Sequence, residues 1–339
     1  MRILTVTNMY PHPEHPAMGV FVQDQVRDVQ ELGHEVEVLV VEGWRSRWDY
    51  LAACHRVRRA VRTRSYDVLH VHYGLTGLPA LCQREVPMVL SYCGSDLEVP
   101  WQRLISRWVN RYLQGRLVKS PTLLPLLGDP RAWVVPNGVN LEKFHPIPRA
   151  EARRRLGLPQ KPVYIAFVAN PARPEKRFDL AQQAVHLASA SRPMELLVVH
   201  QRPHEEIPWY LNAADVVLLT SDYEGSPNIV KEAMACNRPI VATAVGDVPW
   251  LLEGVQGAAV VQHRPKEIAR ALVEVLEWRE SNGRQRLQAL GLDHRSVARK
   301  LVALYQEALR PVSRNREVSR ETMGVDPVSG AWPLGPGHP

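Results

Sequence analysis

The segment 221–236, SDYEGSPNIVKEAMAC, constrains the fold of this chain more than any other stretch. It follows a short apolar run, Val216 to Leu219, that is typical of a buried strand. Ser226 and Pro227 then form a helix-start signal, with Ser at the N-cap and Pro at the first helical position. A buried strand followed at once by a helix is characteristic of parallel α/β sheets, whose ligands bind at the carboxyl ends of the strands.

The start of this predicted helix is suited to binding an anion. Ile229 stands where a capping box would place Glu or Gln, so no side chain folds back over the helix end. The free N–H groups and the positive end of the dipole can then hold a phosphate. Glu224 precedes this site, and Glu232 lies about 9 Å along the helix at roughly 1.5 Å per residue. This spacing suits a ligand with hydroxyls on both sides of a phosphate, which describes a nucleotide sugar.

The same stretch resembles the E-x7-E signature of retaining glycosyltransferases of family 4, which have the GT-B fold. The resemblance implies that Glu232 binds the ribose of the donor and that Glu224 faces the donor sugar. An ordinary strand–turn–helix with two solvated carboxylates is the alternative. The residues between and beside the two carboxylates are then expected to bind the donor: Gly225, Ser226, Pro227, Asn228 and Ile229.

Strand-like runs recur through the first half of the chain, and helical patterns separate most of them. This alternation predicts a parallel sheet wound with helices. No G-x-G-x-x-G follows the first strand, which argues against a dinucleotide-binding dehydrogenase. The runs are Ile3–Thr7, Val36–Val41, Val68–Val71, Met88–Tyr92, Arg116–Lys119 and Trp133–Val135.

Gly19 follows the first predicted strand at the start of a helix. Family members often carry a Gly pair here beside the donor phosphates, whereas this chain has only Gly19, preceded by Met18. A single Gly can still let a ligand approach the backbone closely. The resemblance therefore implies that Gly19 is a phosphate neighbour, and a plain turn residue is the alternative.

Three residues are candidates for the acceptor side. His70 and His72 alternate along a strand, so we expect a buried, hydrogen-bonded His70 and a His72 that either lines the cleft or is also buried. Many family members read His-Gly-Ser-Asp where this chain has Cys93 to Asp96. Because a thiol cannot replace an imidazole as a donor of the same reach, any step that depends on that His is in doubt. Asp96 lines the acceptor side or caps a helix.

The loop after the strand at 163–168 carries the candidate cations. In the resembled family, an Arg and a Lys at this place neutralise the donor diphosphate. Lys176 keeps the usual register, and Arg173 supplies the second charge from a shifted position; a solvated basic loop is the alternative. Two cations at a leaving diphosphate stabilise the negative charge that develops as the glycosidic bond breaks. Gly246, in a later loop, lies near the donor or is a structural turn.

A basic aromatic stripe marks the segment 101–112. Trp101, Leu104, Trp108 and Tyr112 fall at helical spacing, with Arg side chains between them. Such a stripe is usually part of a core, but a basic helix with aromatics can also lie on an anionic membrane. Membrane docking would suit a lipid-linked acceptor.

The resemblance covers roughly residues 1 to 310 and implies a GT-B fold, in which two Rossmann-like domains face each other across a cleft. We expect an acceptor-side domain at 1–150, a nucleotide-sugar-binding domain at 160–294, and a helix at 295–310 that crosses back onto the first domain. Residues 311–339 are rich in Pro, Gly and charge, so we expect disorder there.

The expected function is retaining transfer of a hexose from a nucleotide sugar to a glycan, a glycolipid or a small acceptor, by default in polysaccharide biosynthesis. No D-x-D motif is present, so we expect no metal and no cofactor. A catalytically silent binding protein and a nucleotide-sugar epimerase are the alternatives. The net charge of +7 comes with no nucleic-acid-binding motif, the four Cys are scattered, and no apolar run approaches membrane-spanning length. A cytoplasmic protein, in peripheral contact with a membrane if the acceptor is lipid-linked, is expected.

Overall fold

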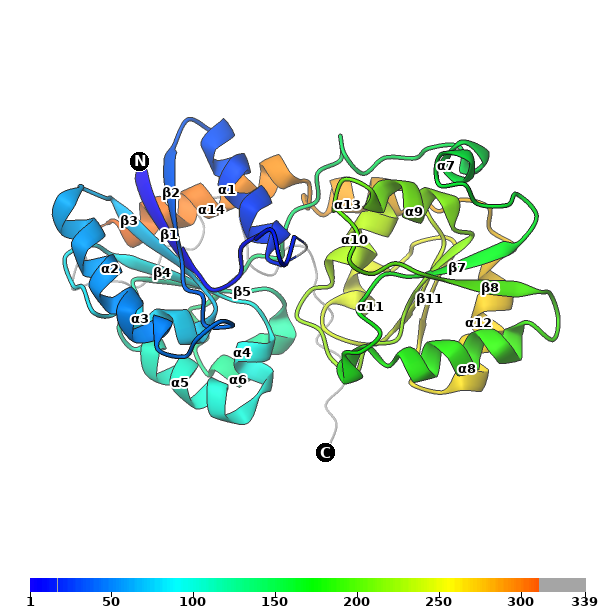
Figure 1. Cartoon of the computed structure of the whole chain (residues 1–339), viewed down its shortest axis with the longest axis horizontal. Coiled ribbons are helices and arrows are strands. Elements are labelled where there is room, and N and C mark those ends of the chain that lie inside the picture. The colour runs from blue at the N-terminus through cyan, green and yellow to red at the C-terminus, as the bar shows by residue number, and fades with distance from the viewer. Residues whose placement is uncertain (17, 311–339) are drawn as a thin grey trace.

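Two parallel β-sheets, one in each half of the chain, organise the structure, a computed structural model that describes residues 1–16 and 18–310 (Figure 1). The first sheet has the strand order β2-β1-β3-β4-β5-β6, and the second has the order β11-β10-β9-β7-β8. Every pair of neighbouring strands is parallel. The two sheets with their helices form two lobes, called here the first and the second lobe.

The six strands of the first lobe, and β7 and β9 of the second, lie within one residue of their predicted positions, which confirms the wound parallel arrangement. Those of the first lobe are β1 Arg2–Thr7, β2 Glu35–Val40, β3 Val68–His72, β4 Met88–Tyr92, β5 Gly115–Val118 and β6 Trp133–Val134. Those of the second lobe are β7 Val163–Phe167, β8 Met194–Val198, β9 Val216–Leu219, β10 Ile240–Thr243 and β11 Ala258–Val261.

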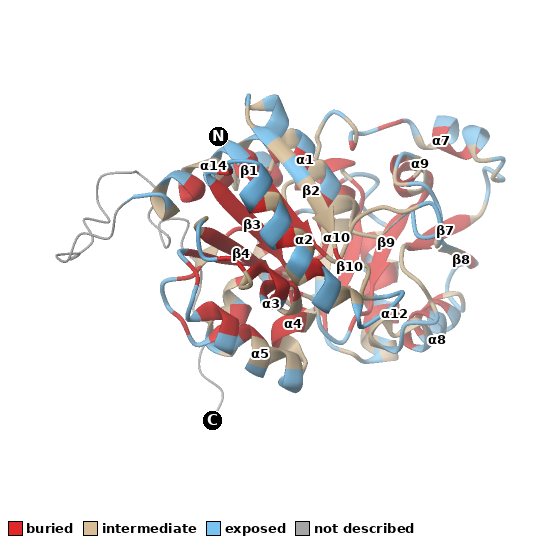
Figure 2. Ribbon diagram, turned by 60° about the vertical axis from the view of Figure 1, so that its left-hand side comes forward, coloured by how far each residue is buried: buried red, intermediate tan, exposed pale blue. Residues whose placement is uncertain are grey.

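The central strands are apolar because helices cover both faces of each sheet. Strands β3, β4 and β9 are buried along their whole length, as the red ribbons of Figure 2 show for β3 and β4. Helix α1, Val20–Glu31, illustrates the complementary helical pattern, since its buried residues Val22, Val26 and Val29 share one face.

The remaining helices lie between the strands and at the end of the described chain. In the first lobe they are α2 Asp49–Thr63, α3 Gly77–Ala80, α4 Ser95–Glu98, α5 Pro100–Asn110 and α6 Leu124–Leu127. They continue with α7 Arg149–Arg155, α8 Phe178–Ala188, α9 Ile207–Ala213, α10 Asn228–Ala235, α11 Val248–Leu251, α12 Pro265–Val275, α13 Gly283–Ala289 and α14 His294–Ala308. Short 3₁₀ turns are η1 Gly74–Thr76, η2 Pro121–Leu123 and η3 Pro174–Lys176.

Helix α14 follows the second lobe in sequence but packs against the first, where it lies among elements from the start of the chain (Figure 1). It contacts α1, β4 and β5, and its residues Leu301, Leu304 and Tyr305 are buried. The Tyr305 hydroxyl is 2.7 Å from Nδ1 of His70, whose Nε2 is 2.8 Å from Oγ of Ser91. His70 is therefore the buried, hydrogen-bonded histidine that its position predicts. The expected disordered segment 311–339 lies outside the described residues.

Helix α5 turns its aromatic stripe away from the core, in contrast to the usual position of such a stripe. Trp101 and Leu104 are 56% and 70% exposed. The opposite face is buried instead, because the Tyr92 hydroxyl bonds to the carbonyl of Ser106 and to the side chain of Asn110. Within residues 1–16 and 18–310, no helix is long and apolar enough to cross a membrane.

Candidate functional site

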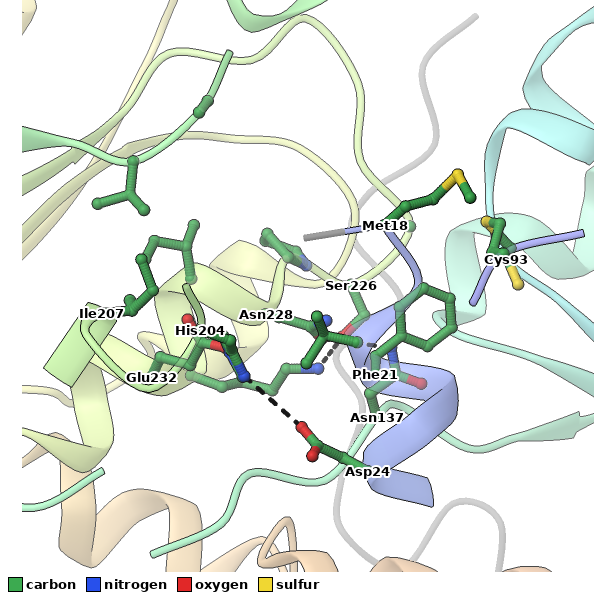
Figure 3. Close-up of a pocket in the computed structure, with 18 of the residues that line it drawn as sticks. Met18, Phe21, Asp24, Cys93, Asn137, His204, Ile207, Ser226, Asn228 and Glu232 are labelled. Carbon is green, nitrogen blue, oxygen red and sulfur yellow. Dashed lines mark hydrogen bonds and ion pairs between the residues drawn. The ribbon is translucent and has the colours of Figure 1, made fainter. Parts of the chain in front are cut away.

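A cleft of about 1200 Å³ lies between the lobes and is lined by loops at the carboxyl ends of both sheets. Figure 3 shows side chains from the two lobes approaching each other across it, among them Phe21 and Cys93 from the first lobe and Ser226 and Glu232 from the second. The lobes come very close at one point. A Cβ atom on Gly225 would lie 2.9 Å from the carbonyl oxygen of Cys93. The loop between β9 and α10, residues 220–227, called here the signature loop, therefore packs directly on the first lobe.

Helix α10 begins one residue later than its sequence signals indicate. Pro227, not Ser226, is the N-cap residue, and no side chain hydrogen-bonds to the helix end. The hydroxyl of Ser226 instead accepts a hydrogen bond of 2.9 Å from Nζ of Lys231, which is buried and needs an acceptor. The prediction of a Ser226 cap is therefore wrong, but the prediction of a helix end free of side-chain caps is confirmed.

Two of the predicted catalytic residues, Lys176 and Glu224, contact each other. Oε1 of Glu224 accepts hydrogen bonds from Nζ of Lys176 at 2.5 Å and from Oγ of Ser221 at 2.7 Å. Both side chains of the ion pair are largely shielded from solvent and line the cleft. A cation and a carboxylate therefore stand together beside the start of α10, and an entering ligand can separate them.

Glu232 lies deeper, as its place in α10 predicts, and it also has a partner. Nε2 of His204 donates to Oε1 of Glu232 at 2.9 Å, and Nδ1 of His204 accepts from Nζ of Lys143 at 2.8 Å. The same Nδ1 atom is 3.8 Å from Oδ2 of Asp24, which comes from α1 in the first lobe (Figure 3). Sequence reasoning missed His204, although its position in the loop after β8, at the carboxyl edge of the sheet, was a usable signal.

Arg173 lines the cleft, but its guanidinium group already has a partner on its own loop. Its side chain is 57% exposed and forms an ion pair with Glu175, two residues along the chain. Asn228 lies within hydrogen-bond reach of Asn137 of the first lobe, 3.2 Å between Nδ2 of Asn137 and Oδ1 of Asn228. Pro227 and Ile229 also line the cleft.

Gly19 and Gly246 lie in loops next to the cleft and pack closely against the backbone of neighbouring segments. Both have positive φ, +67° and +53°, which strains any other residue. A Cβ atom would come within 2.2 Å of the backbone of Met9 at Gly19 and within 2.5 Å of the backbone of Gly225 at Gly246. Neither glycine lines the cleft, whereas the residues on both sides of Gly19 do. The turn role that the sequence left open fits both positions.

Of the three acceptor-side candidates, only Cys93 lines the cleft. His72 is buried beneath it, beside His70 in a small internal cavity. Asp96 is fully buried and accepts backbone N–H groups from Gly74, Cys93 and Gly94, so its carboxylate holds the loop together instead of facing a ligand. It is not a helix N-cap either, since α4 begins at Ser95.

Burial dominates the electrostatics of this region. It raises the pKa of the Cys93 thiol to about 12, an effect that Asp96 strengthens, so the thiol stays neutral at physiological pH. Burial also raises the pKa of Asp96 to about 6, although the backbone N–H groups oppose this shift. Lys119 of the first lobe and Lys231 of the second are two buried cations that line the cleft and that sequence reasoning missed.

A possible cation-binding cluster lies apart from the signature loop. In residues 1–16 and 18–310, the one group of metal-type ligands consists of Asp28, Glu31 and His294, whose ligand atoms lie within 4.8 Å of one another. Asp28 and Glu31 stand on α1, and His294 is the first residue of α14. None of them contacts Glu224 or Lys176.

Two family models match the chain and together span about two thirds of it. The model described as "Glycosyl transferase 4-like domain" matches residues 22–148, and "Glycosyl transferases group 1" matches residues 176–277. A D-inositol 3-phosphate glycosyltransferase of Thermobispora bispora is 26% identical, over 78% of this chain and 76% of that protein.

Solved structures agree with these matches at the level of the fold. Sucrose-phosphate synthase from Thermosynechococcus elongatus has a TM-score of 0.75 at 17% identity and covers 91% of this chain and 99% of its own. HepE of Anabaena, solved in complex with UDP, has a TM-score of 0.67 at 16% identity, over 90% of this chain and 100% of its own.

Proposed function

Because the chain belongs to the family 4 glycosyltransferases with the GT-B fold, and so transfers a sugar from a nucleotide sugar to an acceptor, we propose that it does so with retention of configuration and without a metal ion. The observation that carries this proposal is the Lys176–Glu224 ion pair beside the start of α10, with Glu232 deeper on the same helix. Glu232, the start of α10 with Lys176, and Glu224 follow one another in the same order as the ribose, the diphosphate and the sugar of a nucleotide sugar.

The donor is proposed to bind along α10. Glu232 binds the ribose hydroxyls, replacing its present contact with His204. The diphosphate lies at the first N–H groups of α10, which no side chain caps. Lys176 moves from Glu224 to the diphosphate, and Glu224 then accepts hydrogen bonds from the sugar. Arg173 adds positive charge at the rim once it exchanges Glu175 for the diphosphate. A uridine nucleotide is the first candidate, since HepE was solved with UDP.

Lys176 and the helix end are proposed to do the work that a metal ion does in other transferases. As the bond from the anomeric carbon to the diphosphate breaks, its electron pair moves to the phosphate oxygen. Preorganised N–H groups and a cation at that oxygen stabilise the developing charge. The acceptor hydroxyl then attacks the face that the diphosphate leaves, and its proton passes to the departing diphosphate. Retention follows from attack on that face.

Nucleotide binding tests the donor site. Titration calorimetry with UDP, GDP and ADP, in EDTA and again with magnesium, should show one preferred nucleotide whose affinity survives EDTA. Glu232→Ala should weaken that affinity by about 10- to 100-fold, or roughly 1.4–2.8 kcal/mol. The exposed Glu277→Ala serves as a control that removes the same charge. Binding that requires magnesium would contradict metal independence, and no binding to any nucleotide would favour a silent protein.

Product stereochemistry tests retention. With an α-linked donor, proton NMR of the transfer product should show an α-glycosidic linkage to the acceptor. A β-linked product would overturn retention and leave the donor site unaffected. Release of an isomerised free sugar without an acceptor would instead identify an epimerase.

The exposed stripe of α5 is proposed to contact an anionic membrane that carries a lipid-linked acceptor. Trp101, Leu104 and Trp108 project from one side of this helix, and the exposed Arg111 lies beside them. Aromatic side chains enter the interface of a bilayer while arginines bind lipid phosphates. The net charge of +7 favours the same partner.

Vesicle sedimentation tests the membrane contact. The protein should sediment with vesicles rich in phosphatidylglycerol, and less with pure phosphatidylcholine. The double variant Trp101→Ser/Leu104→Ser should lose this binding, whereas Trp278→Ser, which removes an exposed Trp of the second lobe, should keep it. Equal binding by both variants would rule out α5 as the contact surface.

A further inference from the structure

Two buried lysines approach the floor of the cleft from opposite lobes. Lys119 directly follows β5 in the first lobe, and Lys231 lies in α10 of the second. They are only 2% and 1% exposed, yet both line the cleft. Lysine is rarely buried to this extent without a partner, because removing its charge from water costs free energy.

Lys119 has no partner among the described residues. Its Nζ atom is shielded from solvent and makes no hydrogen bond to any group in residues 1–16 and 18–310. An ammonium group carries three N–H donors, all of which are unused here. Burial lowers the pKa of Lys119, which is the expected effect of removing the charge from water.

The acidic and ionisable groups nearest to Lys119 do not satisfy it. Asp96 accepts three backbone N–H groups, from Gly74, Cys93 and Gly94, and forms no ion pair with Lys119. The thiol of Cys93 stays protonated because burial raises its pKa to about 12. The positive charge of Lys119 is therefore not neutralised by a direct contact.

Lys231 also has hydrogen-bond donors without an acceptor in the described part of the chain. It donates one hydrogen bond, to Oγ of Ser226, and two of its N–H groups have no acceptor in the described part of the chain. Asp247 lies near enough for its charge to favour the protonated lysine, but the two form no ion pair within 4.0 Å. Burial lowers the pKa of Lys231 to about 8, and the nearby charge of Lys119 adds to this shift. The two ammonium groups therefore repel each other across the cleft.

We propose that Lys119 and Lys231 together bind a carboxylate or phosphate group on one of the two sugars that meet at the reaction centre. This inference rests on the proposed function, which places the transferred sugar beside Glu224 and Gly225. Gly225 packs against Cys93 of the first lobe. Both lysines line this cleft, and Lys119 is close enough to Lys231 for its charge to lower the pKa of Lys231, so the two lysines border the same space. An anion there satisfies the unused donors of both lysines and cancels their repulsion.

We infer that these lysines do not bind the donor diphosphate. The uncapped start of α10 and Lys176 already provide its binding site, and Lys119 stands on the opposite lobe. Two sources of the anion share the same chemistry. It is either the carboxylate of a uronic acid transferred from the donor, or a phosphate or carboxylate carried by the acceptor.

Paired donors distinguish the first source. Titration with UDP-glucuronic acid and UDP-glucose, which differ only in the carboxylate at C6 of the sugar, compares their affinities directly. If the anion belongs to the donor, the glucuronic acid form should bind at least about tenfold more tightly to the wild type. Lys119→Met should abolish that preference and leave the affinity for UDP-glucose within about twofold.

A phosphorylated sugar tests the second source. With UDP saturating, glucose 6-phosphate should bind to the wild type and unphosphorylated glucose at least about tenfold more weakly. Lys119→Met should remove the difference. Lys300→Met, which removes one charge from the exposed face of α14, is the matched control and should behave as the wild type does in both titrations.

Stability provides an independent readout. If Lys119 is kept for a ligand and not for the fold, Lys119→Met should raise the melting temperature of the ligand-free protein, because it removes an unpaired buried charge. Lys119→Gln repeats the titrations if the methionine variant misfolds. A lowered melting temperature in both variants would assign Lys119 a structural partner and overturn the proposal.

The donor site and the lysine site can be refuted by different outcomes. UDP binding that depends on Glu232, without any preference for an anionic sugar that depends on Lys119, would overturn the lysine site and leave the transferase proposal intact. Failure of UDP, GDP and ADP to bind would overturn the donor site and the lysine site together.

Discussion

Single residues in the cleft are paired with one another in ways that a donor must change. Glu224 is bound by Lys176 and Ser221, and Glu232 is bound by His204. Each carboxylate that is proposed to bind sugar hydroxyls thus already accepts hydrogen bonds from the protein. Replacing a protein donor with a ligand hydroxyl changes the number of hydrogen bonds little, so the groups stay satisfied in both states. These contacts therefore keep the two carboxylates in place before a donor binds.

Lys176 is predicted to act on turnover more than on stability. Lys176→Ala should lower the rate of donor hydrolysis, which needs no acceptor, by about 100-fold, equivalent to about 2.7 kcal/mol of lost transition-state stabilisation. Unfolding in urea should change by no more than about 1 kcal/mol, because Glu224 keeps its hydrogen bond from Ser221. Lys161→Ala, at an exposed position, is the control. Equal turnover in both variants would remove Lys176 from the reaction.

His204 is predicted to compete with the donor ribose for Glu232. The imidazole donates to the carboxylate oxygen that the ribose is proposed to use, so His204→Ala should tighten nucleotide binding by a few fold, about 0.5–1 kcal/mol. Calorimetry with the preferred nucleotide measures the change, and Glu232→Ala should cancel it. Weaker binding in His204→Ala would show instead that the imidazole orients Glu232 for the ligand.

The residues found from the sequence and those missed differ in a physical way. Lys176, Glu224 and Glu232 belong to motifs whose spacing along the chain carries the information. Lys119 and His204 each follow a strand at the carboxyl edge of a sheet, but no motif distinguishes them from the other residues of those loops. Burial of Lys231 could have been suspected, because it lies one residue before Glu232 in a helix that follows a buried strand.

At the level of elements, the strands of the first lobe and the start of α1 after Gly19 were predictable, whereas the predicted start of α10 was one residue early. The apolar runs set the strands because a parallel sheet covered on both faces needs them. Pro227 and not Ser226 caps α10, and the Ser226 hydroxyl instead accepts a hydrogen bond from Lys231, five residues later. The stripe of α5 could not be assigned to a face from the sequence alone, since both of its faces carry apolar residues. Ser106 and Asn110 became the buried side through contacts with Tyr92.

Asp129 is predicted to fasten α5 to β5. Its carboxylate accepts hydrogen bonds from Arg131 and from Asn110 at the end of α5, and it is 3.4 Å from Nε of Arg116 in β5. Asp129→Asn should therefore lower the free energy of unfolding by about 2–4 kcal/mol at pH 7, since Arg116 is left buried without its counter-charge. Urea unfolding measures the loss.

The effect of Asp129 should depend on pH. Hydrogen bonds from Arg131 hold the pKa of Asp129 well below its ordinary value of 3.8. A carboxylate with a lowered folded-state pKa stabilises the fold above the unfolded-state value, and that contribution is lost as the pH falls. The gap between wild type and Asp129→Asn should thus be full at pH 7 and narrow between about pH 4 and pH 2. A gap that does not change with pH would show that the carboxylate charge is not what stabilises.

For the molecule as a whole, the sequence predicts two lobes but not how closely they approach. Contact between them rests on pairs that are distant in sequence, such as Gly94 with Gly225 and Asp24 with His204. Such pairs have no common motif, because each belongs to a separate local fold. The same holds for the cleft, whose shape follows from the packing of the lobes. Local sequence patterns do not predict how the two lobes are placed, whereas the resemblance to a family of known fold does.

Helix α14 belongs to the first lobe, although it follows the second lobe in sequence. Its Val297, Leu301, Leu304 and Tyr305 are buried, and Leu304 lies 3.1 Å from the Cβ position of Gly115 in β5. Each such side chain contributes about 1.5–3 kcal/mol when buried, and a whole domain is stable by only about 5–15 kcal/mol. The first lobe should therefore depend on this helix for its stability.

A chain that ends after Gly291 tests this dependence. It keeps all eleven strands but should lose the cooperative unfolding transition of the first lobe, seen as a broad urea transition and low protection of β4 and β5 amides in hydrogen exchange. A chain that ends after Arg310 keeps every described element and is the reference for this comparison. If the shorter chain unfolds at the same urea concentration as the longer one, α14 is not part of the core of the first lobe.

A single substitution in α14 should have a smaller effect. Tyr305→Phe should lower the free energy of unfolding by about 1–3 kcal/mol, because it leaves Nδ1 of the buried His70 without its hydrogen-bond partner.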